Sequence, residues 1–146
     1  MWVRAPLRAR GAPQNQPRRP YDAAGQGEAL SPGAVRPDVV EELTPSEVAR
    51  RLKETPAEVL LLDVREPFER EVAVIEPSLH IPMQEVPART PEVPKDRTVV
   101  VYCHSGGRSA MVAGYLEQRG WTRVANLHGG IDAWSREVDR KVPRYG

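Results

Sequence analysis

The sequence predicts an α/β protein built on a parallel sheet, and three observations support this. The predicted strand 58–64 has a continuous aliphatic run at 59–62, and Thr98–Tyr102 is β-branched and aromatic throughout, as in strands covered on both faces. A helical pattern follows each run, and alternating segments of this kind form parallel sheets with right-handed crossovers. The chain's single cysteine, Cys103, directly follows the second run, where such sheets bind their ligands.

Composition limits the classes of function. The chain has 146 residues, 40% of them hydrophobic, which is enough for one domain with a modest core. A net charge of +1 gives no reason to expect nucleic acid, and no apolar run approaches the roughly 18 residues of a membrane span. One cysteine and three isolated histidines predict neither a disulfide nor a metal site. We therefore expect a cytoplasmic protein without metal, cofactor, nucleic acid or membrane contact.

The N-terminal segment differs from the rest of the chain. Residues 1–37 hold six prolines, four glycines and six arginines against two acidic residues. Such a segment buries too little apolar surface to offset the entropy of ordering. We expect a disordered or loosely packed extension over residues 1–37 and a folded domain over residues 38–146. A transit peptide is an alternative, but the prolines would interrupt the amphipathic helix that it needs. A secretory signal is excluded because the segment has no apolar run of the required kind.

Local signals place the elements of the first half. A short edge strand is expected near Val40, followed by a helix with Thr44 as N-cap, Pro45 at its first position and Glu47 completing a capping box. The helix ends before Pro56. The buried strand 58–64 comes next, followed by a short helical turn at 67–71, a loop at 72–78, a strand at 79–82 and another turn at 83–88.

The second half continues the alternation. After the strand Thr98–Tyr102, apolar residues at helical spacing begin at Ala110, and Gly120 is placed as the C-terminal cap. A strand at 123–127, a turn at 128–130, a helix at 131–138 carrying Trp134 inward and an exposed tail at 139–146 complete the domain.

The loop between the strand Thr98–Tyr102 and its helix carries the candidate chemistry. Backbone N–H groups from Ser105 to Ser109 and the start of a helix both favour an anion beside Cys103. Gly106 and Gly107 allow the loop to curl, and Arg108 adds a positive charge with a planar set of donors. A lone cysteine is more often a small buried hydrophobe, but this placement favours a thiolate that attacks or holds a small anionic group.

Four segments resemble a single rhodanese domain in order and spacing: LLDVREPFE at 61–69, LHIPMQEVPAR at 79–89, VVVYCHSGGRSA at 99–110 and NLHGGIDAW at 126–134. The resemblance covers most of residues 40–140. It implies a rhodanese-like five-stranded parallel sheet with helices on both faces. The C-terminal stretch is similar to small bacterial rhodaneses and to rhodanese domains fused to adenylating enzymes of sulfur-carrier pathways.

The resemblance implies sulfurtransfer. Cys103 would take the outer sulfur of a small anionic donor such as thiosulfate as a persulfide and pass it to a thiol, cyanide or a sulfur-carrier protein. Arg108 would hold the donor's anionic end, and the loop residues His104, Ser105, Gly106, Gly107 and Ser109 would surround the substrate. The altered loop at 73–78 lacks the family's usual histidine and glycines, which puts substrate access in question.

Two other functions stay open. Cysteine phosphatases place five residues between cysteine and arginine, whereas four lie between Cys103 and Arg108, so the narrower loop opposes a phosphatase or arsenate reductase. A non-catalytic rhodanese-like interaction module is the second alternative, against which the intact cysteine loop argues.

Several supporting residues have both a functional and a structural interpretation. Asp63 and Arg65 match the family's Asp-x-Arg and either brace the active loop or form a structural ion pair at a strand end. His104 is expected to face solvent and tune specificity, with proton transfer as the alternative. Ser109 either donates to the bound anion or serves only as the N-cap of the helix.

Overall fold

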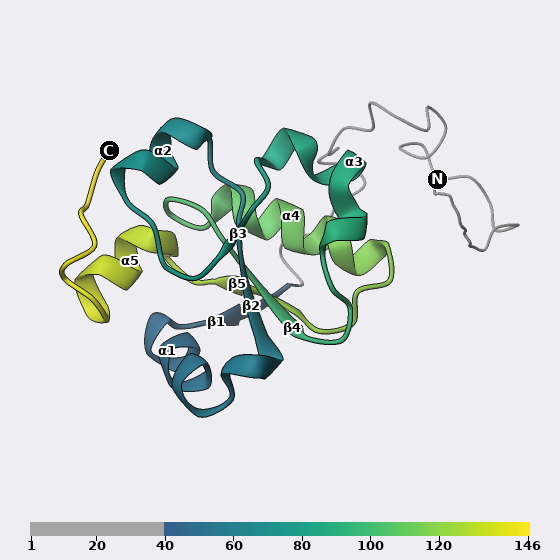
Figure 1. The fold of residues 1–146 in the computed structure, drawn as a ribbon, viewed down its shortest axis with the longest axis horizontal. Coiled ribbons are helices and arrows are strands. Elements are labelled where there is room, and N and C mark those ends of the chain that lie inside the picture. Colours follow the sequence, from purple (N-terminus) through teal and green to yellow (C-terminus); the bar gives the residue numbers. More distant parts are fainter. Residues whose placement is uncertain (1–39) are drawn as a thin grey trace, which may run out of the picture.

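The computed structural model describes residues 40–146, so the predicted extension over residues 1–37 lies outside them. In the described part, five parallel strands form one sheet in the order β1-β5-β4-β2-β3 (Figure 1). This confirms the predicted α/β class and strand number. The strands are β1 Glu41–Leu43, β2 Val59–Asp63, β3 Leu79–His80, β4 Thr98–Tyr102 and β5 Val124–Leu127.

Helices cover both faces of the sheet, as expected from the sequence. They are α1 Pro45–Glu54, α2 Pro67–Val72, α3 Val86–Arg89, α4 Gly107–Gln118 and α5 Gly130–Glu137, with short 3-10 turns at η2 Pro56–Glu58, η3 Met83–Glu85 and η4 Thr90–Glu92. In Figure 1, α3 and α4 lie on one side of the sheet and α1 and α5 on the other. In the described residues, no helix is long and apolar enough to span a membrane.

The central strand β4 divides the core because its side chains alternate between the two faces. Val99 and Val101 pack in the cluster that includes Val112 and Leu116 of α4. Val100 and Tyr102 pack in the opposite cluster, with Val48 of α1 and with Ile131 and Trp134 of α5. Strand β4 is therefore covered on both faces, and its carboxyl end is fixed at the centre of the sheet.

Helix boundaries show where local signals were sufficient. Thr44 caps α1 by accepting a hydrogen bond from the Glu47 N–H at 3.2 Å, as predicted, but the Glu47 carboxylate pairs with Arg50 and Arg51. The prediction that α4 starts near Ala110 is wrong by one turn. Gly106 is its N-cap at φ +113°, so Ser109 lies inside the first turn and is not the cap. Gly120 follows the end of α4 at φ +107°, consistent with its predicted capping position.

Candidate active site

Cys103 directly follows β4, and the residue is 1% exposed. Two N–H groups donate to Sγ, that of Gly106 at 3.1 Å and that of Ser109 at 3.4 Å, and the Ser109 hydroxyl lies 3.3 Å from it. The loop curls around the sulfur because Gly106 adopts the left-handed conformation, which side chains disfavour. Ser105 and Gly107 are exposed at the rim. The arrangement presents N–H and O–H groups to a sulfur atom and suits a negative charge there.

The N-terminal end of α5 is hydrogen-bonded to the backbone of this loop. The Ile131 and Asp132 N–H groups donate to the carbonyls of Cys103 and His104 at 2.9 and 3.1 Å. Gly130, at φ +64°, allows this contact, since a Cβ placed there would come within 2.6 Å of the Cys103 carbonyl oxygen. The sequence identified residues 128–130 only as a turn, and the structure shows that the turn holds the strand end carrying the cysteine.

Asn126 contacts the cysteine loop and was not identified from the sequence. Its Oδ1 lies 2.5 Å from the Ser109 hydroxyl, and its Nδ2 donates to the Glu42 carboxylate and the Gly106 carbonyl. The Ser109 hydroxyl has one proton, so it donates either to Asn126 or to Sγ of Cys103. The sequence did contain a signal, because Asn126 is the one polar residue in the strand Val124–Leu127. The structure buries its amide, and buried amides need hydrogen-bond partners.

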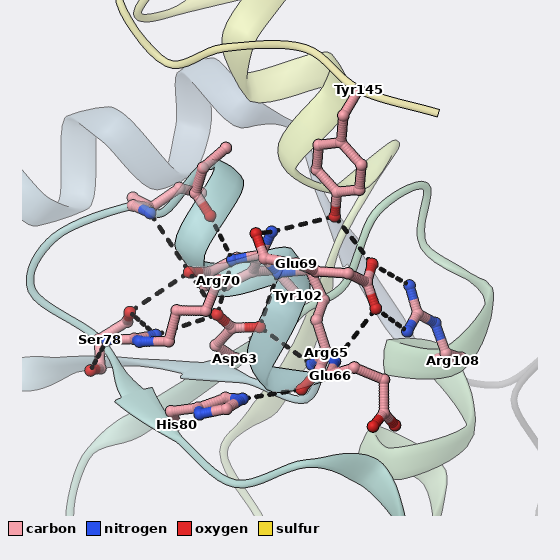
Figure 2. Close-up of polar contacts among 12 residues, drawn as sticks. Asp63, Arg65, Glu66, Glu69, Arg70, Ser78, His80, Tyr102, Arg108 and Tyr145 are labelled. Atoms are coloured by element: carbon pink, nitrogen blue, oxygen red, sulfur yellow. Dashed lines mark hydrogen bonds and ion pairs between the residues drawn. The ribbon is translucent and has the colours of Figure 1, made fainter.

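Arg108 is held by the carboxylate of Glu69, a residue to which the sequence assigned no role. Its Nη1 and Nη2 donate to the two oxygens of Glu69, on α2, at 2.7 and 2.9 Å (Figure 2). Hydrogen bonds from Arg108 lower the pKa of Glu69 to about 2. The Arg108 side chain is 36% exposed, whereas Glu69 is 7% exposed. Because a guanidinium has five N–H groups, Arg108 keeps donors for a further anion.

Asp63 and Arg65 form a fully buried ion pair next to this site. Arg65 Nε and Nη2 donate to the two Asp63 oxygens at 2.9 and 2.8 Å, and both side chains are 0% exposed. Asp63 also accepts from the Arg65 N–H, Arg70 and Tyr102. Burial raises the pKa of Asp63, but the hydrogen bonds from Arg65 outweigh it, so that pKa is below its ordinary value. In the described part of the chain, these polar contacts tie β2 to α2 and do not include the Cys103 sulfur.

The prediction of an exposed tail at 139–146 is wrong for Tyr145, which is partly buried, whereas Arg144 and Gly146 are exposed. The Tyr145 ring stacks on His104 with centroids 4.4 Å apart, and its hydroxyl bonds Glu69 and Arg65. His104 is therefore half-buried beneath the C-terminal segment and does not face solvent as expected. Local pattern gives no sign of this, because the contact joins residues 41 positions apart in the chain.

The altered loop at 73–78 is anchored to the same polar cluster. The Ala73 carbonyl accepts from Arg65 Nη2 at 2.7 Å, and the Ile75 N–H donates to the Tyr102 hydroxyl at 3.3 Å.

Among residues 40–146, no group of three or more His, Cys, Asp and Glu side chains is arranged to hold a metal ion.

The Glu69–Arg108 pair makes the free energy of unfolding depend on pH. Glu69 has a folded-state pKa of about 2 against an ordinary 4.5, so its contribution is complete above pH 4.5 and is lost as the pH falls toward 2. We expect Glu69→Gln to lower the free energy of unfolding by about 2 kcal/mol at pH 7, discounted for the exposure of Arg108. Urea unfolding at intervals from pH 7 to pH 2.5 measures this gap. A gap that stays constant over the range would contradict the assignment.

Comparison with known proteins places this geometry in a family. The sequence pattern of the rhodanese-like domain matches residues 44–137. A protein named sulfurtransferase from Allochromatium vinosum is 46% identical over 98 residues, which cover 67% of this chain and 91% of that protein. The adenylyltransferase and sulfurtransferase MOCS3-1 of Zea mays is 33% identical over 93 residues, covering 59% of this chain but only 20% of that longer protein.

Solved structures agree with the sequence matches. The crystal structure of a rhodanese-related protein from Thermoplasma volcanium has a TM-score of 0.61 and 30% sequence identity. The alignment covers 67% of this chain and 93% of that chain. The parallel sheet and its helices are therefore shared with a structure of the same family.

Proposed function

We propose that this chain, which belongs to the rhodanese-like family, is a sulfurtransferase that carries the transferred sulfur on Cys103. The observation that supports this most directly is the pair of backbone N–H groups, from Gly106 and Ser109, that point at the Cys103 sulfur, with the Ser109 hydroxyl beside them. Donors fixed in this way stabilise a negatively charged sulfur without rearranging during the reaction. The relative from Allochromatium vinosum supports the same proposal, because it is named a sulfurtransferase and the match covers 91% of its length.

The proposed reaction has two displacements. The Cys103 thiolate attacks the outer sulfur of thiosulfate, the sulfur–sulfur bond of the donor breaks, and its electron pair leaves with sulfite. The persulfide formed on Cys103 carries its negative charge on the terminal sulfur. An acceptor thiolate or cyanide then attacks that sulfur, and the electron pair of the broken bond returns to Cys103 as a thiolate.

The proposed acceptor is a thiol or a sulfur-carrier protein. A relative from Bacillus subtilis, 37% identical over 79 residues, is named a putative sulfur carrier protein, which supports a carrier as partner. Cytoplasmic location is part of the same proposal, because an unpaired thiol nucleophile needs a reducing compartment. Parallel assays with thiosulfate, mercaptopyruvate and an aryl phosphate separate the proposal from its rivals: phosphate release without sulfur transfer would identify a phosphatase, and no turnover would identify an interaction module.

Arg108 is proposed to bind the anionic end of the donor through the N–H groups that Glu69 leaves unused. We expect Arg108→Ala to raise the KM for thiosulfate about ten- to a hundredfold, the usual range for hydrogen bonds to charged groups. Steady-state sulfite release measures it. Arg89→Ala is the matched control, because Arg89 pairs with the carboxylates of Glu85 and Glu92 outside the site. An unchanged KM in the Arg108 variant would remove this residue from donor binding.

A further inference from the structure

The C-terminal segment reaches into the proposed active site through Tyr145. Its hydroxyl donates to Glu69 Oε1 at 2.9 Å and accepts from Arg65 Nη1 at 3.0 Å (Figure 2). Its ring lies on His104, the residue after the nucleophile, and Gly146 also approaches that imidazole. A residue next to the C-terminus is therefore joined by direct contacts to the carboxylate that holds Arg108.

The orientation of Glu69 depends on polar contacts. Glu69 is the only buried residue among the six of α2, whereas Phe68 and Val72 on the same helix are 66% and 46% exposed. Apolar packing of α2 therefore contributes little to fixing the carboxylate. Four donors fix it instead: the Arg108 Nη1 and Nη2 groups, the Glu66 N–H and the Tyr145 hydroxyl. Of these, the Tyr145 hydroxyl comes from outside α2 and the cysteine loop.

We propose that Tyr145 is a positioning residue of this active site, whose hydroxyl orients the Glu69 carboxylate so that Glu69 holds Arg108 ready for the anionic donor. The proposal rests on the sulfurtransferase function proposed above. It makes the last residues of the chain part of the donor-binding site. Burial raises the pKa of Tyr145 to about 12, so its hydroxyl keeps its proton at neutral pH and remains a donor.

Tyr145→Phe removes the hydroxyl and keeps the ring that stacks on His104. We expect this variant to raise the KM for thiosulfate about three- to tenfold, the range for one hydrogen bond, with kcat changed less than twofold. Arg144→Ala is the matched control, because the neighbouring Arg144 side chain is 57% exposed and pairs with the carboxylate of Asp132, whereas Asp132 meets the cysteine loop through its backbone N–H. Thermal unfolding midpoints of both variants, compared with wild type, separate positioning from a loss of folding.

The Glu69→Ala background tests whether Tyr145 acts through Glu69. If it does, Tyr145→Phe has no further effect on KM in that background, because residues that act through a shared partner are not additive. An equal rise in both backgrounds, or no rise in the wild-type background, would overturn the proposal. A merely structural role for the tyrosine would lower stability in both backgrounds alike.

A second readout does not require sulfur transfer. Alkylation of Cys103 by iodoacetate, an anion, is compared with alkylation by neutral iodoacetamide, since a positive charge near the thiol favours the anion. We expect the ratio of the two rates to fall in Arg108→Ala and to fall partway in Tyr145→Phe. A lowered ratio without any turnover in the wild type would refute the sulfurtransferase function and keep the positioning role. Normal wild-type turnover with an unchanged ratio and KM in Tyr145→Phe would refute the positioning role and keep the sulfurtransferase function.

Discussion

Cys103→Ala is expected to abolish sulfur transfer and the gain of one sulfur atom on incubation with thiosulfate. The Cys103 sulfur accepts hydrogen bonds from Gly106 and Ser109 at the end of β4. The chain contains no second cysteine that could replace it as nucleophile. Loss of the nucleophile should reduce kcat/KM by at least roughly a thousandfold, as for other covalent catalysts. Intact mass spectrometry detects the persulfide, and release of sulfite measures turnover.

Cys103→Ser provides the control for shape. Serine keeps the size of the side chain and the surrounding donors but lacks a thiolate, so we expect the same loss with an unchanged thermal unfolding midpoint. Treating the wild type with a reductant should remove the added sulfur from the intact mass, because a persulfide is reducible. A mass gain that persists in either variant would place the chemistry on another residue.

Asp63→Asn is expected to cost about 3–5 kcal/mol in the free energy of unfolding, because it leaves the Arg65 guanidinium buried without its counter-charge. The amide that replaces the carboxylate also brings its own N–H groups against donors from Arg65, Arg70 and Tyr102. For a domain with a typical stability of about 5–15 kcal/mol, this is a large fraction. Urea unfolding followed by circular dichroism gives the value.

Two further variants make the Asp63 result specific. In the double variant Asp63→Leu/Arg65→Met both charges are removed, and we expect it to regain most of the lost stability, because apolar replacements of a buried pair are often neutral. Glu85→Gln breaks a pair whose two side chains are 53% and 33% exposed, and it should cost less than about 1 kcal/mol. A loss below 1 kcal/mol for Asp63→Asn would mean that the buried pair does not hold β2 and α2 together.

The strands of the fold could be predicted because their signals are local. Thr98–Tyr102 reads as a buried strand from five consecutive residues and is β4 with the same bounds. The start of α4 could not be read in the same way, because Gly106 and Gly107 have poor helix propensity and the helix begins there only when the loop is closed around Cys103.

The candidate site was predictable to the extent that it is contiguous in sequence. The segment 103–109 contains the cysteine, its donors and Arg108, so its residues could be named together from the sequence. Glu69, Asn126 and Tyr145 contact this segment from three other parts of the chain. Their partners are set by the packing of α2, β5 and the C-terminal segment, and nothing in their local sequence states which residue they meet.

The sequence by itself determined the α/β class, the order of the strands and helices along the chain, and Cys103 as the candidate nucleophile. These follow from hydrophobic periodicity and from residues adjacent in the chain, which short-range forces control. Only the tertiary structure decided that Arg108 is held by Glu69, that Asp63 and Arg65 pair in the interior, and that Tyr145 closes over His104. The Glu69 and Tyr145 contacts join distant segments, whereas Asp63 and Arg65 are two positions apart and the fold decided only that their pair is buried. Burial makes all of these contacts strong, because once water is excluded each charged or polar group must find its partner within the fold.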